Sequence, residues 1–213
     1  MKKITLLSTV AATAFAMFTC AAYAADTAEL KVKGVIKPAA CTPSFSGGGV
    51  IDYGVIPASS LKADAYTTLP TKEVNLSITC DAAVKVAFKA KDNRANSVVS
   101  GIVSEAEANF GLGTVAGKNV GGYIINISRA STVDGAAANN IYSLDSGKSW
   151  SNGAGNVWNN GALFGFSTGS QPMSTKQLNA KLNVTTVLNK PANLPLTQEV
   201  PLDGSATFEV IYL

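Results

Sequence analysis

The sequence contains no histidine, and charged residues are scarce for its length. Lysine and arginine number 17 and aspartate and glutamate 14, or 15% of 213 residues, against the roughly 25% usual in soluble domains. Without imidazole there is no Ser–His–Asp or Cys–His catalytic group and no histidine metal ligand. The net charge of +3 offers no basic stripe for phosphates. Composition therefore argues against an enzyme and against nucleic acid as a partner.

Motifs of catalytic type are also incomplete. Residues 59–62 match the S-x-x-K pattern of penicillin-recognising enzymes, but the companion motifs S-D-N and K-T-G are absent. Residues 111–116 match G-x-G-x-x-A without the βαβ context that a dinucleotide site needs. We therefore predict no catalytic residue, no cofactor and no metal site.

Long hydrophobic runs are missing after the first two dozen residues. Residues 1–24 have the three parts of a secretory signal peptide: the cations Lys2 and Lys3, the apolar run 4–18 and the small-residue site 22–24. The apolar run is too short for a membrane span. We expect cleavage after Ala24 and export of residues 25–213 as a soluble protein.

Cysteine is scarce as well, because only Cys41 and Cys80 follow the predicted signal peptide. In an oxidising compartment an isolated pair most simply forms a disulfide. Closing a loop of about 40 residues would stabilise the fold by about 4 kcal/mol on the chain-entropy model. The alternative is a free reactive thiol, which here has no histidine or basic cluster to favour the thiolate.

Most of the remaining chain alternates apolar and polar residues with a period of two, as half-buried strands do. The positions that share the expected inward face are Val74, Leu76, Ile78 and Cys80; Val84, Val86 and Phe88; Tyr123, Ile125 and Ile127; Leu182, Val184 and Thr186; and Ala206, Phe208, Val210 and Tyr212. Clusters of Gly, Asn, Asp and Pro separate these segments, and the best helix candidate, residues 104–108, is one short turn. The pattern predicts an all-β antiparallel sandwich or barrel.

Residues 145–169 differ from the rest, because they are rich in Ser, Gly and Asn and contain Trp150 and Trp158. We interpret this segment as a long surface excursion, in which the tryptophans cover the core. Alternatively, Trp150 and Trp158, with Tyr142, Phe164 and nearby asparagines, form a platform for a host or surface glycan, because aromatic rings stack on apolar sugar faces.

The two ends of the exported chain also alternate. In residues 25–37, one face carries Ala28, Leu30, Val32, Gly34 and Ile36. At the other end, a strand follows Gly204 and runs to the last residue, with Tyr212 second from the end. An alternating N-terminal segment of this kind is also typical of an ordinary edge strand in its own domain.

These features, in this order, resemble those of the subunits of chaperone–usher fimbriae, the pilins of Gram-negative bacteria. Near the N-terminus, residues 33–36 come shortly before 39–41, and the run 50–54 is similar to the V-x-D/L-F-G segment of pilins. Cys80 lies at the spacing of the pilin disulfide. Further on, residues 120–127 are similar to a G-x-G-I-x-I strand, and residues 204–212 are similar to the terminal strand with its penultimate tyrosine, here Tyr212.

The resemblance implies an incomplete immunoglobulin-like antiparallel β-sandwich at residues 38–213, preceded by an N-terminal donor strand at 25–37. Leu30, Val32 and Ile36 would enter the gap in a neighbouring subunit by strand addition, with Gly34 where the groove is too shallow for a side chain. The implied partners are copies of the chain or other pilin subunits, a periplasmic chaperone that contacts Phe208, Val210 and Tyr212, and an outer-membrane usher. The implied location is the periplasm in transit and then a fimbrium at the cell surface.

Two other functions remain open on the sequence alone. One is a secreted or periplasmic carbohydrate-binding sandwich that uses Trp150 and Trp158. The other is a fimbrial-like periplasmic protein that does not polymerise, because its own N-terminal strand completes its sheet.

Overall fold

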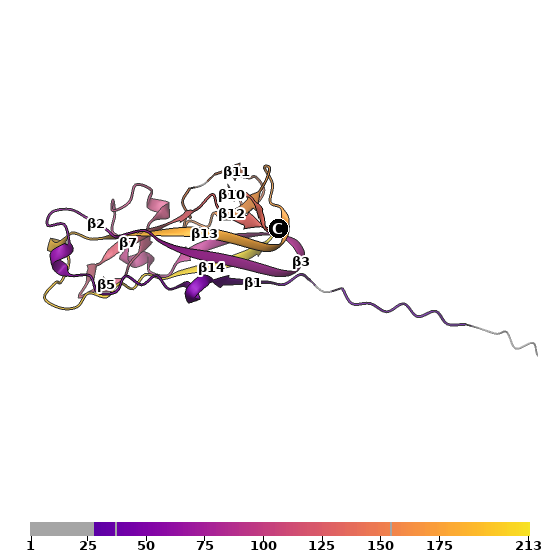
Figure 1. The fold of residues 1–213 in the computed structure, drawn as a ribbon, viewed down its shortest axis with the longest axis horizontal. Coiled ribbons are helices and arrows are strands. Elements are labelled where there is room, and N and C mark those ends of the chain that lie inside the picture. Colours follow the sequence, from indigo (N-terminus) through magenta and orange to yellow (C-terminus); the bar gives the residue numbers. More distant parts are fainter. Residues whose placement is uncertain (1–27, 37, 154) are drawn as a thin grey trace, which may run out of the picture. The chain divides into compact units, whose positions relative to one another are not determined.

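The computed structural model describes residues 28–36, 38–153 and 155–213 (Figure 1). The chain divides into two units, Met1–Lys37 and Pro38–Leu213. Every strand of the described residues belongs to the second unit. The predicted signal peptide lies outside the described residues. Within these ranges, no helix combines the length and the apolar character needed to cross a membrane.

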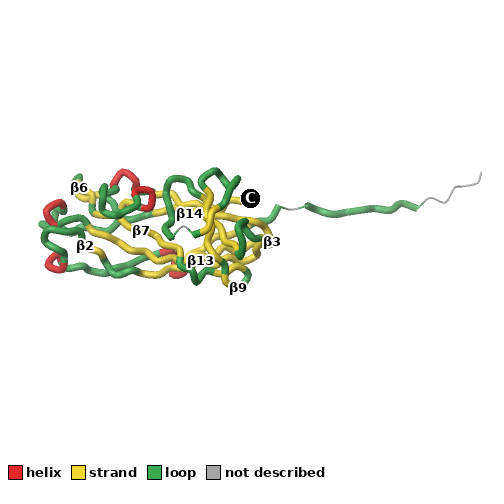
Figure 2. The backbone as a smooth tube through the Cα atoms, turned by 90° about the horizontal axis from the view of Figure 1, so that it is seen from above, coloured by secondary structure: helices red, strands yellow, loops and turns green. Residues whose placement is uncertain are grey.

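Pro38–Leu213 is built almost entirely from strands. The strands are β1 (Cys41–Phe45), β2 (Thr67–Thr68), β3 (Lys72–Asp92), β4 (Phe110–Gly111), β5 (Thr114–Val115), β6 (Lys118–Asn119), β7 (Gly121–Ile127), β8 (Thr132–Val133), β9 (Ala136–Ala137), β10 (Asn139–Ser143), β11 (Ser151–Asn152), β12 (Leu163–Ser167), β13 (Ser174–Leu188) and β14 (Ala206–Tyr212). The helical segments, drawn red in Figure 2, are the short 3₁₀ turns η1 (Ser46–Gly49), η2 (Ala58–Ser60), η3 (Ala95–Ser97), η4 (Ala106–Ala108) and η5 (Pro191–Asn193). The predicted all-β antiparallel fold is confirmed, and η4 is the short turn expected at 104–108.

Strand β3 belongs to two layers of the fold. Its first half pairs with β1 on one side and β13 on the other, and β13 continues the layer to β7 and β4. Its second half pairs with β14 on one side and β12 on the other, and β12 continues to β10 and β11. All of these pairings are antiparallel, and Figure 1 shows β3 and β13 running side by side.

Outside the last strand, the predicted inward positions are buried or half-buried. Leu76, Ile78 and Phe88 of β3 are fully buried, and Ile125 and Leu182 lie beside them in the same hydrophobic cluster. In β14, by contrast, Phe208 and Val210 are only half-buried, and Tyr212 is exposed. The last strand therefore faces the core without being covered by it.

A disulfide joins Cys41 to Cys80, as predicted. The two residues are direct partners in the β1–β3 ladder. Asp81 reinforces this corner, because its Oδ1 accepts a hydrogen bond of 2.8 Å from the backbone N–H of Ala40. The disulfide thus fixes β1 to the middle of β3.

Two sequence-based interpretations are wrong. Residues 81–83 do not separate two strands, since β3 runs unbroken through them; they contain no Gly or Pro to stop it. Residues 163–167 are not part of a surface excursion but form the fully buried strand β12. Phe164 stacks on Phe88 with ring centroids 5.6 Å apart, and Trp150 covers the opposite face of β12 beside Gly165.

Candidate functional site: a groove beside the last strand

A groove lies between two segments that are distant in the sequence. One wall is formed by Phe45 and residues 49–61, and the other by residues 194–208. The floor comes from the inner faces of β3, β13 and β7, and its residues include Val74, Leu182 and Ile125. Core side chains therefore form the bottom of an open channel.

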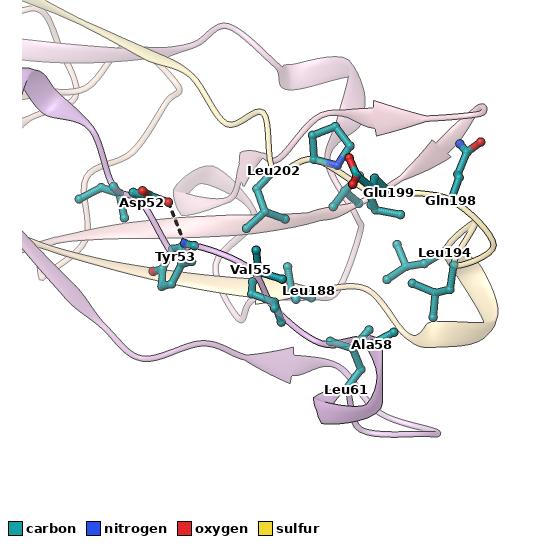
Figure 3. A pocket seen from close by; sticks show the side chains of 17 residues that line it. Asp52, Tyr53, Val55, Ala58, Leu61, Leu188, Leu194, Gln198, Glu199 and Leu202 are labelled. Atoms are coloured by element: carbon teal, nitrogen blue, oxygen red, sulfur yellow. Dashed lines mark hydrogen bonds between the residues drawn. The ribbon is translucent and has the colours of Figure 1, made fainter.

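The groove consists of two adjoining hollows of about 530 and 390 Å³. Both are lined by Ile51, Tyr53 and Leu202, so they adjoin at these side chains. Figure 3 shows the larger hollow, with Leu194 and Leu202 on one side, Tyr53 and Leu61 on the other and Leu188 between them. Its lining is mostly aliphatic.

The first wall is extended but unpaired. Residues 50–57 belong to no strand, although Ile51, Tyr53 and Ile56 are half-buried against the core. The Asp52 side chain shapes this wall by accepting a 2.7 Å hydrogen bond from the N–H of Gly54, which has a φ of 63°. The Lys72 ammonium lies 5.1 Å from the centre of the Tyr53 ring. The segment therefore packs an apolar face on the core without a ladder partner among the described residues.

The second wall ends in β14, which pairs only with β3 among the described residues. An unpaired strand edge presents a row of free backbone donors and acceptors. The groove therefore offers both parts of a strand-binding site: apolar hollows between its walls and, where Ala206 and Phe208 line the smaller hollow, the unpaired edge of β14.

Gly204 sets the path of the chain into β14. A Cβ at this position would lie 2.8 Å from Cε1 of Tyr123 and 3.2 Å from Cδ1 of Leu112, so a side chain would collide with the floor. The preceding Asp203 forms a two-pronged ion pair with Arg94, with Nε–Oδ2 at 2.9 Å and Nη2–Oδ1 at 3.1 Å. The hydrogen bond and charge of Arg94 lower the pKa of the Asp203 carboxyl.

Tyr123 and Tyr53 bring hydroxyl groups to the apolar groove. Burial raises the pKa of Tyr123, and the nearby Asp92 carboxylate adds to this effect. The hydroxyl of Tyr53 is buried and has no hydrogen-bond partner among the described residues. Tyr123 therefore packs in the groove as a neutral phenol.

The apolar side chains of the predicted donor strand are almost fully exposed, unlike those that line the groove. In the unit Met1–Lys37, the described residues 28–36 form no strand or helix. Leu30 and Val32 are 90% exposed, Val35 is 91% exposed and Ile36 is fully exposed. A Cβ at Gly34 would meet no neighbouring atom. The apolar face of this tail is thus unburied.

The two tryptophans lie on opposite faces of β12. Trp150 packs over Gly165, whereas Trp158 lies 6.0 Å from Phe164 and packs edge-on against Tyr142, with ring centroids 5.0 Å apart. Neighbouring residues of a strand point to opposite faces. The structure therefore does not bring the two tryptophans into one platform.

The indole N–H groups are already bonded within the domain. Trp150 donates to the carbonyl of Gly147 at 3.1 Å, and Trp158 donates to Glu105 at 3.0 Å. Glu105 accepts a second hydrogen bond from Asn156, and these two bonds lower the pKa of its carboxyl. Trp158 thus ties the loop containing it to the segment before η4.

Sequence reasoning matched residues 50–54 to a pilin segment but did not identify them, or the rest of the walls, as lining a groove. The residues concerned are Ile51, Tyr53, Ile56 and Leu61 on one side and Leu194, Leu196, Val200 and Leu202 on the other. An available signal was the presence of apolar residues at alternate positions in segments interrupted by Pro57, Pro195 and Pro201. Within the described ranges, no group of three or more Cys, Asp or Glu residues is placed to hold a metal ion.

Two proteins of Escherichia coli are similar to this chain over nearly its whole length. The chain is 28% identical over 228 residues to the "Uncharacterized protein YhcF" of Escherichia coli (strain K12), an alignment that covers 93% of this chain and 95% of that protein. It is 28% identical over 250 residues to "Protein GltF" of the same organism, with coverage of 100% and 98%.

A family model matches residues 30–143, which are more than half of the chain. The matched span begins in the exposed tail, includes both disulfide cysteines and the first wall of the groove, and ends with β10. The chain therefore belongs to the DUF1120 family, described as "Protein of unknown function".

Proposed function

We propose that the groove binds an extended strand supplied by a second copy, namely residues 28–36 of the neighbour's N-terminal tail. The protein is then a structural subunit of a chaperone–usher surface fimbria, assembled by donor-strand addition and supporting adhesion. The observation that carries the proposal is that one chain has both a groove and a segment suited to fill it. The groove exposes core side chains beside the unpaired edge of β14, and the tail has an apolar face that is not buried.

The tail is long enough to follow the whole of β14. Nine extended residues span about 30 Å, and the seven residues of β14 span about 23 Å, at about 3.3 Å per residue. Burying Leu30, Val32 and Ile36 at about 1.5–3 kcal/mol each supplies about 5–9 kcal/mol before ordering costs. Backbone bonds to β14 provide general affinity, while the apolar alternation selects the register.

The charges of the two parts are also complementary. The polar face of the tail carries Lys31 and Lys33 beside one carboxylate, Glu29, which pairs with Lys31 at 3.1 Å, so this face has a net positive charge. Asp52 and Glu199, by contrast, line the larger hollow. A tail that directs Leu30 and Val32 inward directs its lysines toward the rim, where these carboxylates lie. Exposed pairs of this kind contribute little energy, but they favour correct orientation over other apolar segments.

Head-to-tail pairing of this kind does not close on itself, so it builds a fibre. A periplasmic chaperone would cover the groove and the β14 edge, including Phe208 and Val210, before assembly, and an outer-membrane usher would pass the subunits to the surface. The resemblance of both termini to those of pilins supports this route, as does the signal-peptide pattern of residues 1–24. We therefore place the protein in the periplasm during transit and in a surface fimbrium afterwards.

The test is a substitution on each face of the tail. Leu30→Asp places a charge where the donor strand must be buried, so it should abolish the ladder of subunits seen on a non-boiled gel. Val35→Asp is the matched control, because Val35 is equally exposed but lies on the opposite face. It should leave the ladder intact.

Persistence of the ladder in Leu30→Asp would overturn donation by this face. Equal loss in both variants would show that tail charge, rather than insertion, controls assembly. Secretion and the unfolding midpoint of each variant, measured in parallel, establish that the body of the subunit still folds.

A further inference from the structure

The groove is closed at one end by direct contacts between β1 and β14. The hydroxyl of Tyr212 accepts a 2.7 Å hydrogen bond from the backbone N–H of Cys41. Further along, the rings of Phe45 and Phe208 meet edge to face, with centroids 5.1 Å apart and planes at 83°. These contacts join the first and last strands of Pro38–Leu213.

The hollows stop at the same aromatic pair. Phe45 and Phe208 line the smaller hollow, but neither hollow is lined by Cys41 or Tyr212. The open part of the groove thus extends from the aromatic pair to the far end of the walls. Beyond the aromatic pair, the Tyr212 side chain bridges β14 to the backbone of Cys41.

The hydrogen bond at Cys41 involves a backbone donor that a neighbouring strand would use. In the β1–β3 ladder, Cys41 is the partner of Cys80, yet its N–H donates to Tyr212. Tyr212 is 49% exposed and its partner is also at the surface, so the contact can open without disturbing the buried core. A side chain here occupies a position suited to an added strand's carbonyl.

We propose that Tyr212 and the Phe45–Phe208 pair form a latch that holds β1 against β14 in the unpartnered subunit. This inference rests on the proposed function, and it adds a control on the same groove. The incoming strand, residues 28–36 of another copy, occupies the open part first. Full insertion then requires β1 and β14 to separate, and a strand carbonyl replaces the Tyr212 hydroxyl on the Cys41 N–H.

The latch sets how quickly the groove accepts a strand. Loss of the one hydrogen bond between the Cys41 N–H and the Tyr212 hydroxyl, which must break before full insertion, should speed the step about fivefold. The variant is Tyr212→Phe, which keeps the ring and removes only the hydroxyl. The control is Tyr66→Phe, because Tyr66 lies beneath Lys190 and does not line the groove.

The experiment measures uptake of a fluorescent peptide with the sequence of residues 28–36. The acceptor is the full exported chain carrying Leu30→Asp, so that its own tail does not compete. Fluorescence anisotropy gives the rate, and amide hydrogen exchange at Cys41 gives the opening of the latch in the same variants. We expect Tyr212→Phe to raise both rates about fivefold, and Tyr66→Phe to raise neither.

The outcomes separate the two proposals. Peptide uptake at equal rates in the parent and Tyr212→Phe, with equal exchange at Cys41, overturns the latch and leaves strand binding standing. Absence of uptake in every acceptor overturns the proposed function, and the latch as a control on it falls too. Faster uptake in Tyr212→Phe alone supports both.

Discussion

The aromatic interior around Phe88 and the groove around Leu202 are built from the same two layers, but they differ in how they are covered. Phe88 is fully buried and contacts Phe164, Phe166 and Phe208, with centroids 5.5 to 6.5 Å apart. Leu202 and Tyr53 pack on the same continuous core but remain half-buried at the edge of a hollow. The difference lies in strand pairing, because β3 is flanked on both sides near Phe88, whereas the groove walls have no strand between them.

This comparison shows that an open site does not require an unusual composition. Ordinary apolar side chains line both regions, mainly aromatic around Phe88 and mainly aliphatic in the groove, and what distinguishes the groove is that no strand lies between its walls. Around Phe88, folding has already buried the apolar surface. In the groove, apolar surface is still exposed, so burying it under a partner strand can supply binding energy. Substitutions should therefore affect stability in one region and association in the other.

The largest expected effect separates the two regions by stability. Phe88→Ala removes a ring from the closed interior and should lower the free energy of unfolding by about 3–5 kcal/mol. Leu202→Ala removes a half-buried side chain, so it should cost only about 1 kcal/mol. Urea denaturation of both variants provides the measurement. Equal losses would mean that the groove is packed as tightly as the interior.

A smaller effect with the opposite sign is expected at the wall of the groove. The buried hydroxyl of Tyr53 has no hydrogen-bond partner among the described residues. Removing an unsatisfied buried polar group recovers its desolvation cost, so Tyr53→Phe should raise the free energy of unfolding by about 1 kcal/mol. Urea denaturation again gives the comparison, with Tyr142→Phe as a control outside the groove. A loss of stability in Tyr53→Phe would show that the hydroxyl is bonded in solution.

The smallest expected effect is the response of the second wall to acid. Arg94 lowers the pKa of Asp203, so the folded state favours the ionised carboxylate more than the unfolded state does. This contribution is fully present above the unfolded pKa of about 3.9, and it is lost as pH falls through the lower folded value.

Asp203→Asn should therefore show a smaller fall in melting temperature between pH 5 and pH 3 than the parent chain. Asp64→Asn, at an exposed loop carboxylate, is the matched control and should fall as the parent does. The opposite ranking of the two variants would place the acid-sensitive contact elsewhere in the fold.

Alternation was sufficient to predict the strands that have one face in the core and the other toward solvent. This is why Leu76, Ile125 and Leu182 were placed correctly, and why scarce cysteine in an exported chain predicted the disulfide. The pattern failed for β12, because Trp150 covers its outer face at Gly165 and both faces are therefore buried. Alternation cannot mark a strand that has no solvent face.

The candidate site could be predicted only in part. The tail and β14 carry regular alternation, so both ends of the proposed interaction were visible in the sequence. The walls at residues 50–61 and 194–202 have little regular secondary structure, contain prolines and alternate half-buried with exposed residues. Their shared position depends on contacts between distant segments, which local periodicity does not encode. The latch at Cys41 and Tyr212 is of the same kind, since 171 residues separate its two partners.

The disulfide also determines how the domain responds to mechanical load. Any tension on the chain ahead of Cys41 enters at this residue, and the sulfur bridge transfers it covalently to Cys80 in the middle of β3. The ladder between β1 and β3 is thereby spared from peeling one rung at a time. Force therefore reaches β3, the strand shared by both layers, through a covalent bond rather than through the β1–β3 ladder.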